Sequence, residues 1–174
     1  MSPQTQLALI VDHEACWGCM ACEVACKKEN GVDPGIKFIR VDEEPVRLRN
    51  GKPYFSYHVN ACLHSVCEGT PCVDVCPTSA ITQREDGIVI MDIDDCVGCD
   101  LCIPECPHDA IVFNARLSVT QKCNMCFVRV DAGLIPACAD NICLAHCIYF
   151  GDPDKIRLQI EMRRIVRDRL SALD

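Results

Sequence analysis

The chain has 174 residues and 17 cysteines, and only 5% of its residues are aromatic. The apolar fraction of 49% includes the cysteines, so a conventional hydrophobic core is small for this length, and disulfides, zinc or iron–sulfur clusters must help to hold the fold. A net charge of −8 argues against the classes that need a basic surface, namely nucleic-acid-binding proteins and proteins that dock on anionic lipid.

The segment before Cys16 has neither a basic stretch nor a long apolar one, so we expect no secretory or twin-arginine signal. No run approaches the roughly 18 apolar residues of a membrane helix, so we also expect no membrane span. Both features favour a cytoplasmic location. Thiols stay reduced in the cytoplasm, which favours metal ligation over disulfides. The odd number of cysteines also argues against a scheme of disulfides alone.

The cysteines form four groups along the chain. The first and third groups share the spacing C-x2-C-x2-C-x3-C, and the second and fourth are variants with longer gaps. The members are Cys16, Cys19, Cys22 and Cys26; Cys62, Cys67, Cys72 and Cys76; Cys96, Cys99, Cys102 and Cys106; and Cys123, Cys126, Cys138, Cys143 and Cys147.

The shared spacing is typical of bacterial ferredoxins. Three cysteines on a tight loop can bind one cubane, and the fourth points away to a second cluster. We therefore predict [4Fe–4S] clusters rather than zinc, whose structural sites use paired C-x2-4-C knuckles. The repeat extends upstream, because residues 10–19 and 90–99 both read as a short strand, an acidic turn and C-x-G-C. Gly18 and Gly98 are expected where the backbone bends around a cluster, and Trp17 is interpreted as a packing residue.

Residues 27–54 are predicted to form loops and a hairpin that cover the cluster core. The extended pieces are 36–41 and 54–60, and Asn50-Gly51 predicts a tight turn between them. A helix is expected over about 153–172, because Asp152 can cap it and Pro153 suits its first turn. Its broad apolar face predicts packing on the chain itself or docking to a partner.

The order of the groups, and the C-x11-C gap in the fourth, resemble the four-cluster iron–sulfur subunits of molybdenum and tungsten oxidoreductases. These are the electron-transfer subunits of the dimethyl sulfoxide reductase, formate dehydrogenase and nitrate reductase type. The resemblance covers about residues 5–152, and residues 139–147 are similar to the small subunits of tungsten aldehyde oxidoreductases and of tungsten benzoyl-CoA reductase. Its most specific stretches are PCVDVCPTSAI (71–81), DGIV (86–89), KCNMC (122–126), AGLIPAC (132–138) and FGD (150–152).

The resemblance implies an α+β fold of two bacterial-ferredoxin-like dicluster modules, one inserted in the other, with short strands and helices. The inner module would be residues 55–114, and the outer module would be residues 1–54 plus 115–152. Residues 153–174 lie beyond the resemblance, and their own pattern predicts a C-terminal docking helix. Four [4Fe–4S] clusters are implied, held by Cys16, Cys19, Cys22 and Cys143 (cluster 1); Cys62, Cys67, Cys72 and Cys106 (cluster 2); Cys96, Cys99, Cys102 and Cys76 (cluster 3); and Cys123, Cys126, Cys138 and Cys26 (cluster 4).

Two departures from the family pattern leave alternatives open. The second group usually begins C-x-H-C, but Ser65 and Val66 are inserted here after His64. Cys62 is the expected ligand, and His64 is the alternative. If Cys62 is the ligand, His64 is a turn residue near the cluster. In the fourth group, the distance to Phe150 favours Cys143, and Cys147 is the alternative fourth ligand of cluster 1. The cysteine left over would be a small buried apolar residue.

The resemblance implies an electron-transfer subunit rather than an enzyme. It would relay electrons between a tungsten- or molybdenum-pterin catalytic subunit and a redox partner, such as a flavin-containing NAD-linked subunit or a ferredoxin. Self-association into longer wires is a further expectation. The alternatives are a free-standing polyferredoxin and a zinc-stapled interaction module. The sequence has no Walker loop and no G-x-G-x-x-G motif, which argues against nucleotide or flavin binding.

Overall fold

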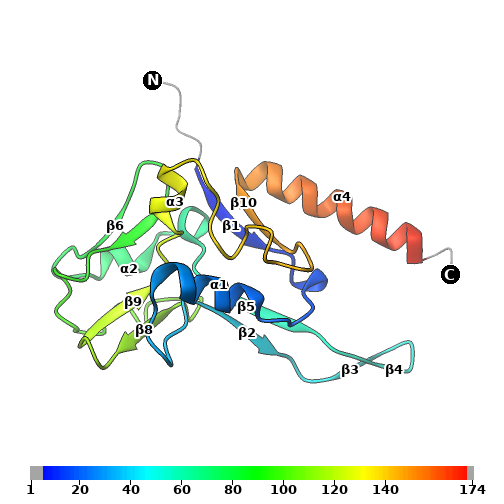
Figure 1. Ribbon diagram of the computed structural model, residues 1–174, viewed down its shortest axis with the longest axis horizontal. Helices are drawn as coiled ribbons and strands as arrows, with labels where there is room; N and C mark the ends of the chain where they lie inside the picture. The colour runs from blue at the N-terminus through cyan, green and yellow to red at the C-terminus, as the bar shows by residue number, and fades with distance from the viewer. Residues whose placement is uncertain (1–5, 172–174) are drawn as a thin grey trace.

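The structure is a computed structural model that describes residues 6–171. Within that range it is an α+β fold of short antiparallel strand pairs and helices joined by long loops (Figure 1). Its elements are β1 (Ala8–Val11), a 3-10 helix (His13–Ala15), α1 (Ala21–Asn30), β2 (Ile39–Glu43), β3 (Arg47–Arg49), β4 (Lys52–Tyr54), β5 (Tyr57–Ala61), a second 3-10 helix (His64–Val66), α2 (Pro71–Asp74), β6 (Ile81–Gln83), β7 (Val89–Met91), β8 (Ile111–Asn114), β9 (Val119–Lys122), α3 (Phe127–Asp131), β10 (Ile148–Gly151) and α4 (Pro153–Ser171).

Strand pairing joins segments that lie far apart in the sequence. β1 pairs with β10, with Leu9 opposite Phe150, so the first and last strands close one sheet. β2 pairs with β5, and β8 pairs with β9. The β2–β5 and β8–β9 pairs cross the expected borders at residues 54/55 and 114/115, so strand pairing ties the two expected modules together.

The predicted hairpin forms an arm that reaches away from the body (Figure 1). β3 and β4 pair at its tip around Asn50 and Gly51, whose φ angles of 53° and 74° give the left-handed turn that Asn-Gly favours. The predicted turn is confirmed. The predicted extended pieces are displaced by about three residues, because the paired strands begin at Ile39 and Tyr57.

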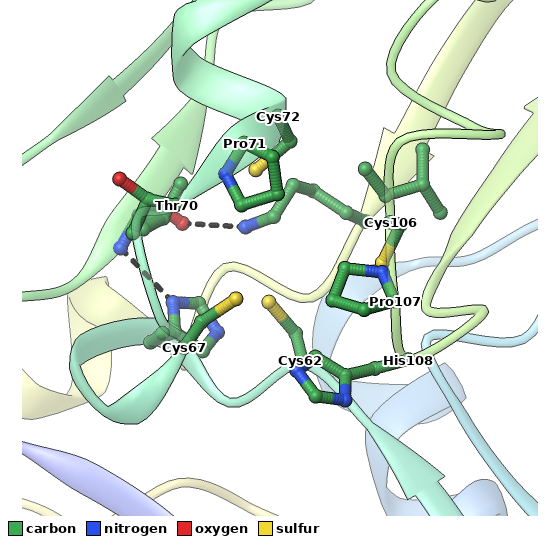
Figure 2. A pocket seen from close by; sticks show the side chains of 12 residues that line it. Cys62, Cys67, Thr70, Pro71, Cys72, Cys106, Pro107 and His108 are labelled. Atoms are coloured by element: carbon green, nitrogen blue, oxygen red, sulfur yellow. Dashed lines mark hydrogen bonds between the residues drawn. The ribbon is translucent and has the colours of Figure 1, made fainter.

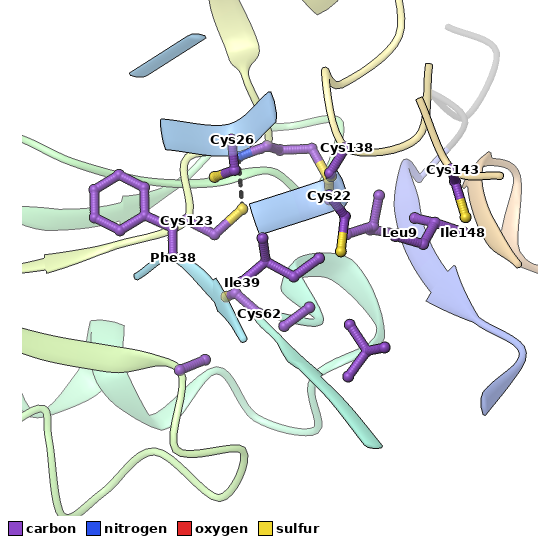
Figure 3. Close-up of a cluster of buried hydrophobic side chains, with 14 of the residues drawn as sticks. Leu9, Cys22, Cys26, Phe38, Ile39, Cys62, Cys123, Cys138, Cys143 and Ile148 are labelled. Atoms are coloured by element: carbon purple, nitrogen blue, oxygen red, sulfur yellow. Dashed lines mark hydrogen bonds between the residues drawn. The ribbon is translucent and has the colours of Figure 1, made fainter. Parts of the chain in front are cut away.

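The core is shared between aliphatic side chains and cysteines. One buried group contains Leu9, Ile39, Val59 and Ile148 among sulfur atoms, as Figure 3 shows for several of them. A second group gathers Ile81, Val89 and Ile111 around cysteines of the second and third groups. The buried cluster around Leu9 also contains Cys22, Cys26, Cys62, Cys123, Cys138, Cys143 and Cys147. The buried cluster around Ile81 also contains Cys72 and Cys102.

The C-terminal helix is confirmed as α4, which begins at Pro153 and is described as far as Ser171. Asp152 caps it, because its Oδ1 accepts the backbone N–H of Asp154 at 3.0 Å. The helix lies against β1 and β10 (Figure 1) through the buried Ile156 and Ile160. No helix in the described range combines the length and apolarity that a membrane span requires.

Candidate metal centres

The four candidate sites are numbered after the clusters expected in them. Site 2 is a pocket lined by Cys62, Cys67, Cys72 and Cys106. Figure 2 shows their sulfur atoms turned toward one space from the end of β5, the second 3-10 helix, α2 and the third cysteine group. Burial, together with the neighbouring Cys62 and Cys106, raises the pKa of the Cys72 thiol to about 11. The structure therefore brings together the four cysteines expected around cluster 2, including the exchanged Cys106.

Site 1 gathers Cys16, Cys19 and Cys22 with both candidates for the fourth ligand. Cys143 and Cys147 are buried, with 3.5 Å between their sulfur atoms. Burial, with a smaller contribution from the charge of a Cys143 thiolate, raises the pKa of the Cys22 thiol to about 12. The geometry alone leaves both candidates at the site.

Site 4 joins Cys123, Cys126 and Cys138 to Cys26 of the first group. Burial raises the pKa of Cys138 well above its ordinary value, and Cys123, Cys26 and Cys126 all raise it further, so these thiols are near neighbours. Figure 3 shows Cys26 and Cys123 beside Phe38, and Cys138 nearer to Cys22. The side-chain amide of Asn30 lies 3.7 Å from the Cys26 sulfur and 3.6 Å from the Cys126 sulfur, so it can donate to either thiolate.

Site 3 contains Cys96, Cys99 and Cys102. The Thr120 hydroxyl lies 3.6 Å from the Cys96 sulfur and 3.5 Å from the Cys102 sulfur. The expected fourth member, Cys76, packs against the buried group that contains Cys102. The Thr78 hydroxyl lies 3.7 Å from the Cys76 sulfur.

The loops of sites 1 and 3 contain glycines for which the structure gives a steric reason. Gly18 and Gly98 have φ angles of 68° and 65°, in the left-handed region. A Cβ at Gly18 would overlap the Tyr57 ring, and a Cβ at Gly98 would overlap the Ser118 carbonyl oxygen. Close packing thus adds to the turn requirement predicted from the sequence.

Replacing Gly98 with alanine is expected to destabilise the folded chain by roughly 2 kcal/mol or more, the sum of left-handed strain and overlap with backbone. The measurement is the thermal unfolding midpoint and the iron content of the anaerobically purified variant. Gly31→Ala is the matched control, because Gly31 has φ 58° and nothing within 4 Å of the added Cβ. Equal losses in the two variants would contradict the packing argument.

Lys122, at the end of β9, is a buried cation between two of the sites. It is 3% exposed, and its Nζ donates to the carbonyl oxygens of Val89 and Cys123, both at 2.7 Å. None of the ion pairs between described residues involves it. Burial raises the pKa of the thiols of Cys72 in site 2 and Cys123 in site 4, while the Lys122 charge opposes that rise. The sequence marked Lys122 only as part of a motif.

These features fit iron–sulfur clusters. Thiolates are the soft ligands that such clusters use, and iron replaces the thiol proton that burial otherwise retains. A buried ammonium whose only partners are carbonyl oxygens is costly unless negative charge lies nearby. Clusters with four thiolate ligands supply that charge, about two negative units each when oxidised. When bound, each cluster takes up or releases one electron.

The structure tests the predictions for two side chains beside the sites, Trp17 and His64. Trp17 lines site 1 but is 66% exposed, so its interpretation as a packing residue is wrong. His64 lies in a turn beside the cysteines of site 2, as expected, but its full burial was not predicted. Burial, and then the charge of Lys122, lower the pKa of His64 well below its usual value. The insertion of Ser65 and Val66 was the only signal that this position is unusual.

Comparison with known proteins supports the same chemistry. A family described as a 4Fe-4S dicluster domain matches residues 54–153. A polysulfide reductase chain of Wolinella succinogenes is 40% identical, over 83% of this protein and 75% of its own length. The thiosulfate reductase electron transfer subunit of Salmonella typhi is 38% identical, over 88% of this protein and 80% of its own length.

A tetrathionate reductase subunit of Salmonella typhimurium is also 38% identical, over 87% of this protein and only 60% of that relative. All three are named as components of reductases of sulfur compounds, and the Salmonella typhi relative is named as the electron transfer subunit. The predicted role in electron transfer rather than catalysis is confirmed. This protein belongs to the family of iron–sulfur electron-transfer subunits of oxidoreductase complexes that contain the 4Fe-4S dicluster domain.

Proposed function

We propose that this subunit carries four [4Fe–4S] clusters and relays single electrons between a molybdenum- or tungsten-pterin catalytic subunit and a second redox partner. The observation that carries the proposal is the gathering of cysteines from different groups at shared sites, Cys106 at site 2 above all. Such exchange of the fourth cysteine is how ferredoxin-type runs hold paired clusters.

The proposed ligand sets follow the family pairing. Cluster 1 would take Cys143 at site 1, with Cys147 as the alternative, and the other three sets are those of sites 2, 3 and 4. The nested arrangement of an outer module (residues 1–54 and 115–152) around an inner module (residues 55–114) belongs to the same proposal. It is supported by the pairing of β1 with β10 at the two ends of the outer segments.

The proximity of cysteines in different sites supports an order along the proposed path. Cys138 of site 4 is a neighbour of Cys22 of site 1, and Cys123 of site 4 is a neighbour of Cys62 of site 2. Sites 2 and 3 share the buried group that holds Cys72 and Cys102. The proposed order of clusters is therefore 1, 4, 2 and 3.

The two ends of this path reach the surface. Cys19 at site 1 and Cys99 at site 3 are exposed, whereas site 4 has only buried cysteines. Exposed apolar side chains flank each end of the path. At site 1, Trp17 and Met20 flank Cys19. Val97 and Leu101 flank Cys99 in the same way. Electrons would enter at one of these ends and leave at the other.

A pterin enzyme as the partner is supported by the family, and a tungsten enzyme only by the likeness at residues 139–147. A flavin-containing NAD-linked subunit or a ferredoxin is proposed at the other end of the path, and self-association of such subunits into longer wires is part of the same proposal. The cytoplasmic location also remains a prediction.

The experiment is anaerobic purification of the tagged full-length chain from its native cell, followed by identification of co-purifying subunits and assay of molybdenum and tungsten. A stoichiometric pterin enzyme containing either metal is expected. A chain that purifies alone, loaded with clusters and without either metal, would instead support the free-standing polyferredoxin.

The outer face of α4 is proposed as the surface that docks the catalytic subunit. Leu158, Met162, Val166 and Leu170 recur every four residues and are all more than half exposed. We expect Val166→Glu to lower the amount of catalytic subunit recovered with the tagged chain. Leu48→Glu is the matched control, because Leu48 is an exposed apolar residue on the hairpin arm. Equal recovery from the two variants would rule out docking through α4.

A further inference from the structure

His64 has one hydrogen-bonded ring nitrogen and one free one. The side chain is 0% exposed, and its Nδ1 accepts the backbone N–H of Val89 at 2.9 Å. The buried Nε2 has no hydrogen-bond partner among the described residues. The Ser65 hydroxyl donates to the Leu7 carbonyl oxygen at 2.6 Å and helps to fix the 3-10 helix that carries the ring.

The bond from Val89 determines where the ring proton lies. A nitrogen that accepts an amide N–H must be unprotonated, so the proton of the neutral imidazole of His64 is on Nε2. Nε2 is then a donor. A metal at Nε2 would move the proton to Nδ1, where it would face the Val89 N–H, so the geometry disfavours His64 as an iron ligand.

The pocket that the ring lines offers sulfur as the partner. His64 shares this pocket with Cys62, Cys67, Cys72 and Cys106. Lys122 also lines it but has only donors, and both of its observed bonds go to backbone carbonyls. A buried N–H without an acceptor is costly, and thiolate or cluster sulfur is the acceptor that a loaded site provides.

We propose that Nε2–H of His64 donates a hydrogen bond to a sulfur atom of the cluster held at site 2, and that this bond raises the reduction potential of that cluster. The inference rests on the proposed ligand set of site 2. Reduction makes the cluster more negative by one electron, so a fixed donor stabilises the reduced form more than the oxidised form. His64 is then a residue that tunes the potential and not a ligand.

Two substitutions separate the two ring nitrogens. In His64→Asn, the side-chain oxygen can replace Nδ1 as acceptor for Val89, while the donor at Nε2 is lost. Asparagine also tolerates the φ of 48° at this position. In His64→Gln, the longer amide can return a donor near the position of Nε2 but leaves the Val89 N–H without its acceptor. His146→Asn is the control, because His146 has φ 46° and an exposed side chain.

The measurement is an EPR-monitored redox titration of the anaerobically purified full-length protein. We expect His64→Asn to lower the potential of one cluster and leave the other three unchanged. His64→Gln should keep that potential closer to the unsubstituted value. Its thermal unfolding midpoint should fall more than that of His64→Asn, because the Val89 N–H loses its acceptor. Equal potentials in His64→Asn and in the His146→Asn control, at full iron content, would overturn the inference.

Pulsed EPR on protein labelled with ¹⁵N-histidine supplies a second readout. A weak nitrogen coupling to one reduced cluster, absent in His64→Asn, is expected for a hydrogen bond to sulfur. A strong coupling would mean iron ligation by His64 and would also overturn the inference. If the unsubstituted protein lacks a cluster at site 2, the proposed ligand set fails, and iron analysis of that protein identifies this case separately.

Discussion

Replacing Cys143 with alanine is expected to remove cluster 1, whereas Cys147→Ala should retain it. The two sulfur atoms are 3.5 Å apart, so position alone does not distinguish them. Hydrogen bonding distinguishes the two thiols, because the backbone N–H of Cys147 donates to the Cys143 sulfur with an N···S distance of 3.4 Å. Backbone amides donate in this way to cluster-binding thiolates, and the distance of Cys143 from Phe150 matches the family spacing.

Iron analysis with EPR of the reduced protein measures this difference. Cys143→Ala should fall from about sixteen to about twelve irons per chain and lose one reduced-cluster signal, while Cys147→Ala stays near sixteen. Alanine is used because a serine hydroxyl could still bind iron. Loss of the cluster only in Cys147→Ala would make Cys147 the ligand and Cys143 the buried spare thiol.

Replacing Lys122 with methionine is expected to lower the reduction potentials of clusters 2 and 4 together. The buried ammonium is a neighbour of Cys72 and Cys123, and it favours the more negative, reduced form of both clusters. At an effective dielectric constant near 20 and a separation of about 8 Å, one charge contributes about 2 kcal/mol. For a one-electron couple this is about 90 mV.

The measurement is a redox titration of the loaded variant, since two backbone carbonyls lose their donor and the yield of loaded protein should fall as well. Lys155→Met is the matched control, because it makes the same change in net charge on a side chain that is 80% exposed and screened by water. Unchanged potentials in Lys122→Met, or an equal shift in Lys155→Met, would contradict this role.

Features set by neighbouring residues could be predicted from the sequence. The Asn50-Gly51 turn and the start of α4 at Pro153 depend on local backbone preferences, and both are confirmed. The C-x2-C-x2-C-x3-C runs encode their chemistry in their own spacing, and the family match agrees with [4Fe–4S] binding.

Features set by pairing across the chain could not be predicted. The burial of Lys122 depends on its bond to Val89, a residue in another hairpin, although a lysine in a strand usually points to solvent. The burial of His64 depends on the same residue. Trp17 differs from its prediction for the opposite reason. An aromatic residue beside a cysteine run suggests a core position, but Trp17 is exposed at the surface.

Native mass spectrometry of the anaerobically isolated complex, with this protein released intact, tests the central claim most directly. Four clusters bound to one polypeptide should give a mass above that of the bare polypeptide equal to four [4Fe–4S] units, with about sixteen irons and as many sulfides. A mass excess of two clusters, or of zinc ions without sulfide, would contradict a four-cluster electron path through this subunit.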